Sequence, residues 1–159
     1  MNDRPGTLIE IILLAAWLGA AIFFSAVVAQ AAFAVLPTRT LAGALVGRVL
    51  PVLFFAGIAL GALIFVIEGV WGIGWFSGRG FAGLLVVLAC AVAQFIVGAR
   101  IDRIRLEIGG PIDALSPTDP RRLAFGRLHA ISVGWLGVAI VAAVVALILA
   151  SRATQSRTP

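Results

Sequence analysis

Residues 99–132 read ARIDRIRLEIGGPIDALSPTDPRRLAFGRLHAIS, and this charged stretch decides the fold because long apolar runs flank it on both sides. It holds six of the twelve arginines, four of the seven acidic residues and the only histidine. Isoleucines recur at helical spacing over its first ten residues, and Gly109-Gly110-Pro111 then stops that helix. A second helix begins after the stop. The stretch therefore predicts a charged helical hairpin, about residues 101–127, that projects from a membrane on its cytoplasmic side.

The second helix of this hairpin has two candidate starts. Ser116-Pro117-Thr118-Asp119 fits a capping box with proline in the first helical position. Asp119-Pro120 offers another start three residues later. From either, the helix continues to about residue 151, which is longer than one crossing requires.

The composition places the chain in lipid rather than in water. Of its 159 residues, 62% are apolar and 12% are charged, whereas soluble domains are about half apolar and about a quarter charged. The net charge of +5 comes wholly from arginine. We expect no nucleic-acid partner, because no basic face carries interleaved aromatic residues. The single cysteine, Cys90, excludes an internal disulfide and a multi-cysteine metal site.

Four apolar runs are long enough to cross a bilayer. They predict an all-α, up-down antiparallel four-helix transmembrane bundle in a single domain, residues 1–159. The expected spans are about residues 8–36, 50–75, 81–100 and 128–150. A cleaved signal peptide ending near residues 29–31 is the rival interpretation of the first run, which is too long for one.

Local signals mark the ends of these spans. Pro37 ends the first helix and Thr38 caps the second, which bends where Pro51 removes a backbone hydrogen bond. The sequence Ser77-Gly78-Arg79-Gly80 predicts a tight turn before the third span. Glycines spaced by four, at 43 and 47 and at 57 and 61, favour close helix packing.

Arginine counting sets the expected orientation. The 1–2 and 3–4 connections carry eight arginines, and the opposite side carries four: Arg4, Arg79, Arg152 and Arg157. The positive-inside rule then places both connections in the cytoplasm and both termini outside. Trp17, Trp71 and Trp75 are expected toward the outer interface.

Polar residues gather at one depth near the cytoplasmic ends of the spans. This candidate cluster consists of Gln30, Arg48, Gln94, Arg100, Asp102, Arg127 and His129. Because polar groups avoid hydrocarbon, the cluster either lines a vestibule for an anion or lipid headgroup, or makes inter-helix hydrogen bonds beside headgroup-facing arginines. We favour the second interpretation.

Glu10 and Glu68 lie near the outer ends of the first two spans. If they face each other, one of them could hold a proton. We favour the alternative, in which both reach interfacial water or Arg79.

These residues support three functions. We favour a non-enzymatic protein whose basic cytoplasmic face binds anionic lipid, a small anion or a partner protein, with a homo-oligomer also compatible. The alternatives are a small transporter or channel, and a cofactor- or metal-linked oxidoreductase that uses His129. A single histidine is a poor basis for a zinc or haem site, so no cofactor, metal or catalytic residue is assigned.

The chain resembles the transmembrane protein 205-like family, bacterial four-span proteins of unknown function. The resemblance rests on Trp17-x-Gly19, Phe23-Phe24, Leu36-Pro37 and Leu50-Pro51, and is densest over residues 112–117 and 125–132. Gln30 stands where the resemblance implies a proline, and Trp135-Leu136 where it implies an asparagine. The resemblance implies an integral membrane protein and no particular chemistry.

Overall fold

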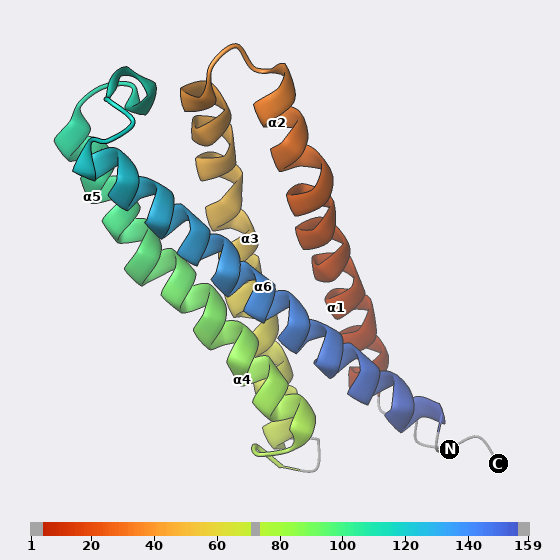
Figure 1. Ribbon diagram of the computed structural model, residues 1–159. Coiled ribbons are helices and arrows are strands. Elements are labelled where there is room, and N and C mark those ends of the chain that lie inside the picture. Colours follow the sequence, from red (N-terminus) through yellow and green to blue (C-terminus); the bar gives the residue numbers. More distant parts are fainter. Residues whose placement is uncertain (1–4, 71–73, 156–159) are drawn as a thin grey trace.

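The computed structural model describes residues 5–70 and 74–155, which form four long helical rods (Figure 1). The first rod joins α1 (Pro5–Phe23), the π-helical turn η1 (Phe24–Val28) and α2 (Ala29–Val35). The second rod is α3 (Arg39–Val70). The described residues contain no strand, which confirms the all-α class.

The other two rods enclose the charged stretch. The third joins α4 (Gly78–Ala91), the π-helical turn η2 (Val92–Gly98) and α5 (Ala99–Ile108). A 3₁₀ turn, η3 (Ile112–Ala114), leads to the fourth rod, α6 (Pro120–Gln155). Gly109 ends α5 with φ of 63°, a left-handed conformation that favours glycine. The sequence predicted this stop.

Each rod is long and apolar enough to cross a membrane. The apolar helices are Thr7–Val35, Arg39–Val70, Gly78–Ile108 and Pro120–Ala153. Their 29 to 34 residues correspond to about 44–51 Å at about 1.5 Å per residue, more than the ~30 Å hydrocarbon core. The chain is therefore a multi-pass membrane protein. The first apolar helix has the expected length, and the other three are longer than their expected spans.

The surface of the bundle is apolar, as a lipid-facing surface must be. Val35 is 80% exposed and Phe81 62% exposed, whereas alanines such as Ala139 and Ala143 are fully buried. Small residues inside let the helix backbones approach closely, which is how membrane bundles gain packing energy without a hydrophobic effect between helices.

The rods pack in cyclic order. α3 lies against α4, α4 against α6, α6 against α1, and α1 against α3. Figure 1 shows the α2–α3 and α5–α6 connections at one end, and the start of α1 and the end of α6 at the other. This is the up-down antiparallel arrangement that the sequence predicted.

The predicted boundary between the first two rods is confirmed. Leu36 is extended with ψ of 141°, as a residue before proline should be. Thr38 Oγ1 accepts a hydrogen bond of 3.2 Å from the amide of Leu41, so it caps α3. Pro51 lies inside α3, which continues through it.

The predicted turn at residues 77–80 is wrong in its extent, because α4 already begins at Gly78. Ser77 is the N-cap, and its hydroxyl accepts a hydrogen bond of 3.0 Å from the amide of Gly80. A Cβ on Gly80 would lie 2.5 Å from the carbonyl oxygen of Trp75. The glycines that indicated a turn therefore allow a crowded first helical turn.

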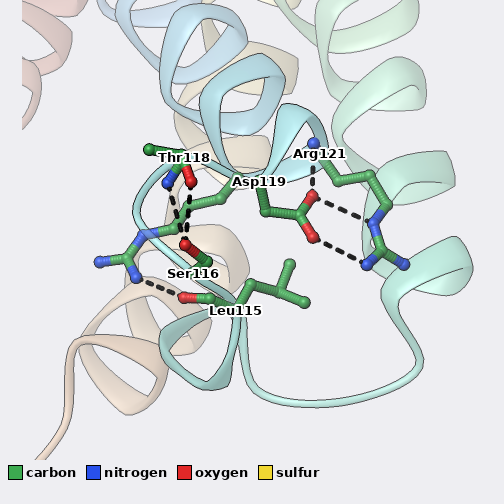
Figure 2. Close-up of polar contacts among 6 residues, drawn as sticks. Leu115, Ser116, Thr118, Asp119 and Arg121 are labelled. Atoms are coloured by element: carbon green, nitrogen blue, oxygen red, sulfur yellow. Dashed lines mark hydrogen bonds and ion pairs between the residues drawn. The ribbon is translucent and has the colours of Figure 1, made fainter.

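The second candidate start of the last helix is the correct one. α6 begins at Pro120, and Asp119 Oδ1 accepts a hydrogen bond of 2.8 Å from the amide of Arg121. Figure 2 shows the Asp119 carboxylate facing the Arg121 guanidinium, with Nη2 2.9 Å from Oδ2. In the preceding turn, the hydroxyl groups of Ser116 and Thr118 share a hydrogen bond of 3.0 Å.

Trp17 does not lie at an interface as predicted. Its side chain is 6% exposed in the core, beside the place where a Cβ on Gly57 would fall. Its indole nitrogen finds an acceptor inside the bundle, so it has no need of water. Trp75 is 44% exposed, and Trp71 lies outside the described residues, as do Arg4 and Arg157 of the arginine count.

Candidate functional site

The seven residues of the predicted polar cluster lie on all four rods near the end that holds the α5–α6 connection. They are Gln30 on α2, Arg48 on α3, Gln94 in η2, Arg100 and Asp102 on α5, and Arg127 and His129 on α6. Gln94 and His129 are partly buried, and the other five are exposed. No hydrogen bond or ion pair among the described residues joins any two of the seven. The structure thus places them at one end without making them converge.

Three exposed arginines of this set share one depth, and we call Arg48, Arg100 and Arg127 the arginine belt. They lie nine, eight and seven residues from the rod ends at Arg39, Ile108 and Pro120. At about 1.5 Å per residue this places each about 10–14 Å from its rod end. No ion pair or hydrogen bond within the described part of the chain occupies their guanidinium groups.

The whole end of the bundle is positive. Its arginines are Arg39, Arg48, Arg100, Arg103, Arg105, Arg121, Arg122 and Arg127, and its carboxylates are Asp102, Glu107, Asp113 and Asp119. Eight minus four gives +4 with His129 neutral. Arg121 pairs with Asp119, and Arg122 donates to the carbonyl oxygen of Leu115 at 2.7 Å.

Arg105 joins three rods, a role that the sequence analysis missed. Its Nη2 donates a hydrogen bond of 3.3 Å to the carbonyl oxygen of Gly43 on α3. Its guanidinium carbon lies 5.5 Å from the centre of the Phe125 ring on α6, and Phe125 stacks on His129. A Cβ on Gly47 would lie 3.0 Å from Arg105 Nη1. At the glycine pair at 43 and 47, the Arg105 guanidinium group thus lies against the surface that was predicted to pack closely on another helix.

Asp102 forms an ion pair with an arginine of the charged hairpin. The partner is Arg105, with 3.7 Å between Nη1 and Oδ1. Because the Asp102 side chain is 72% exposed, the pair contributes little to stability.

Asp113 fastens the charged hairpin to the second rod, which the sequence also did not indicate. Its Oδ2 accepts hydrogen bonds from the Thr40 amide at 3.0 Å and from the Thr40 hydroxyl at 2.9 Å. A carboxylate at the N-terminus of α3 satisfies an otherwise unpaired amide and complements the helix dipole.

At the opposite end, the two predicted carboxylates meet on one arginine. Arg79 Nη2 lies 2.7 Å from Glu68 Oε1, and Arg79 Nη1 lies 3.3 Å from Glu10 Oε2. The Ser77 hydroxyl donates to Glu68 Oε2 at 3.0 Å. Glu10 and Glu68 are each 1% exposed. We call Glu10, Glu68, Ser77 and Arg79 the buried carboxylate site; Ser77 was the member that sequence reasoning missed.

The described residues contain no group of three or more histidine, cysteine, aspartate or glutamate side chains that could hold a metal ion. His129 lies beside Phe125, on which its ring stacks, and near Arg105.

These features define an all-α, four-helix membrane bundle with one basic end and one buried ion-pair site. Residues 12–109 match the family model described as a domain of unknown function, DUF4149, which covers more than half of the chain. The chain belongs to this DUF4149 family. No curated protein and no solved structure matches it. The match includes the arginines Arg48, Arg79 and Arg100 and ends before α6.

Proposed function

We propose that this protein is a non-enzymatic inner-membrane protein that holds anionic lipid headgroups on its arginine belt. The observation that carries the proposal is the common depth of Arg48, Arg100 and Arg127. All three are exposed, and none has a carboxylate partner among the residues that the structure describes. Guanidinium groups at the edge of an apolar surface suit phosphate oxygens, which they bind through paired N–H groups.

The charge of this end supports the same proposal. An excess of four positive charges beside an anionic leaflet is attractive by about 1 kcal/mol for each arginine near the surface. The cytoplasmic leaflet carries the anionic lipids, so the proposal includes a cytoplasmic position for the α2–α3 and α5–α6 connections. Small anions and partner proteins that carry phosphate or carboxylate groups are other ligands with matching chemistry.

The core between the two polar ends favours lipid binding over transport. The buried residues that pack there are apolar, among them Leu14, Phe54, Ile64 and Leu136. A transport route requires polar groups along its length. Within the described residues, the buried polar side chains away from the buried carboxylate site reduce to Ser132.

We also propose that the chain is a transmembrane protein 205-like protein, as its sequence resemblance indicates. Its densest blocks, residues 112–117 and 125–132, follow residue 109, where the family match ends. These blocks contain Asp113, Phe125, Arg127 and His129, which form or border the contacts at the basic end.

Native mass spectrometry with graded phosphatidylglycerol tests the proposal. Replacing the belt by Gln at all three positions should remove bound lipid and its dependence on salt. Arg127→Gln alone should weaken binding about fivefold, the equivalent of about 1 kcal/mol. The matched control is Arg152→Gln, an exposed arginine at the opposite end. Equal lipid occupancy in the wild type and the triple variant would refute the proposal.

A further inference from the structure

We propose that the buried carboxylate site binds one exchangeable proton. The Glu10 carboxylate holds this proton, while Glu68 stays ionised. This inference concerns the end of the bundle opposite to the arginine belt, and it does not depend on lipid binding.

The two carboxylates of the site are unequal in their contacts. Both oxygens of Glu68 have partners, Arg79 at 2.7 Å and the Ser77 hydroxyl at 3.0 Å. From the described residues, Glu10 receives only the longer contact of 3.3 Å from Arg79 to Oε2. Its Oε1 is buried and has no hydrogen-bond partner in residues 5–70 and 74–155. Glu68 is thus the carboxylate whose charge the site satisfies, and Glu10 is the one it leaves unsatisfied.

The charges of the site do not balance unless a proton is bound. Among the described residues, two carboxylates face one guanidinium, so two negative charges against one positive charge leave −1. Within the part of the chain that the structure describes, the charged groups that face Glu10 are Arg79 at the start of α4 and Glu68 of α3. From α6, the ionisable side chain at this end is Arg152, which is exposed and pairs with neither carboxylate among the described contacts.

Burial makes this imbalance costly. Glu10 and Glu68 expose only 2% of their side chains and Arg79 11%. An uncompensated buried ion is strongly destabilising even after relaxation of the protein. Adding a proton to the Glu10 carboxylate gives a neutral carboxylic acid and brings the site to zero net charge. No other bond changes, and Glu68 keeps its ion pair with Arg79.

A proton fits the site better than a metal cation. A calcium ion takes about six to eight oxygen ligands. Here Arg79 already occupies the space between the carboxylates with a positive charge. The site also lies close to water: Glu10 is three residues inside the first span, which begins at Thr7, or about 5 Å. A proton can therefore exchange with the aqueous phase at this end.

Carboxyl-carbon NMR of the intact protein in lipid nanodiscs tests the inference directly. The chain has three glutamates, Glu10, Glu68 and the exposed Glu107, so glutamate labelled with ¹³C at the carboxyl carbon gives three signals. Once each signal is assigned to its residue, we expect Glu10 to be protonated at neutral pH and Glu68 to be ionised. An ionised Glu10 at neutral pH would overturn the inference, as would a Glu10 signal that responds to sodium at constant pH.

Two variants separate proton binding from a purely structural role. Glu68→Gln frees Arg79 to neutralise Glu10, so the Glu10 signal should move to the ionised position at neutral pH. Glu107→Gln is the matched control and should leave the Glu10 signal unchanged. A Glu10 that stays protonated in Glu68→Gln would show that the proton does not depend on the shared arginine, which contradicts the charge balance. If Glu68→Gln fails to fold, the wild-type spectrum still decides.

Discussion

The indole nitrogen of Trp17 on α1 donates a hydrogen bond of 3.0 Å to the main-chain carbonyl oxygen of Leu53 on α3. The contact joins the first two rods two residues after Pro51. Pro51 itself has no backbone N–H to donate within the helix. The Trp17 ring fits because Gly57 carries no side chain, and a Cβ there would lie 2.9 Å from the ring.

Trp17→Phe should destabilise the bundle modestly. The substitution removes the indole donor and keeps most of the aromatic packing, so we expect a loss of about 0.6 kcal/mol, the average for such bonds in membrane bundles. Unfolding in mixed micelles measures it. The control is Trp75→Phe, since Trp75 is 44% exposed and donates no described hydrogen bond. Equal losses in both variants would show that the bond to Leu53 is immaterial.

Gly61→Ala should be more damaging, because α3 and α4 touch there through their backbones. A Cβ on Gly61 would lie 2.5 Å from the carbonyl oxygen of Gly83 and 2.9 Å from Val87. Forcing these helices apart should cost about 1–3 kcal/mol in unfolding free energy. Gly137→Ala on α6 meets nothing within 4 Å, so it should be neutral or slightly stabilising. A tolerated Gly61→Ala would contradict the observed α3–α4 contact.

Asp113→Ala should loosen the charged hairpin from α3. The variant leaves the Thr40 amide and hydroxyl without their acceptor, which for a helix cap costs about 1 kcal/mol. Hydrogen exchange of the first turn of α3 should quicken accordingly. Asp102→Ala, which removes a side chain that is 72% exposed, should leave exchange in that turn unchanged. Unaltered exchange in Asp113→Ala would show that the tie does not hold in solution.

The start of α6 should fray in acid. The side-chain hydrogen bond from Arg121, with help from the Arg121 amide, lowers the pKa of the Asp119 carboxyl from its ordinary value of 3.8. Because the folded state lowers this pKa, the stabilisation is complete above 3.8 and is lost as the pH falls through the lower folded pKa. The Arg121 amide signal, followed by NMR, should report this loss. Asp119→Asn keeps a capping side chain and should abolish the response; a persistent response would assign it to another group.

Most of the fold could be predicted because the signals are local and strong. Pro37, Thr38, Gly109 and Asp119-Pro120 each fix a helix boundary through backbone chemistry that the neighbouring residues alone determine. The turn at residues 77–80 was predicted wrongly in its extent, because glycines in the first turn of a crowded helix look the same in sequence as glycines in a loop.

The sites were less predictable, because they depend on which helix faces lie together. Depth along a span indicated that Glu10, Glu68 and Arg79 share one end, but only the packing of α1 against α3 and of α3 against α4 brings them into contact. Trp17 was misplaced for the same reason. Its depth along the span could be counted from the sequence, but the carbonyl oxygen of Leu53 that accepts from its indole nitrogen could not be predicted. Arg105 and Asp113 form hydrogen bonds to residues of α3 that lie more than 60 positions away in the sequence. No rule based on local spacing could have predicted them.

The proposed lipid site requires the arginine belt to lie at the cytoplasmic leaflet, and cysteine labelling tests this most directly. Wild-type protein is the blank, since its single cysteine, Cys90, is buried. Gly110→Cys adds a thiol on the exposed α5–α6 connection, and Phe76→Cys, at a side chain 92% exposed, adds one at the opposite end. With a membrane-impermeant maleimide, Gly110→Cys should react only in inside-out vesicles and Phe76→Cys only in intact spheroplasts. Labelling of Gly110→Cys in intact spheroplasts would contradict the account.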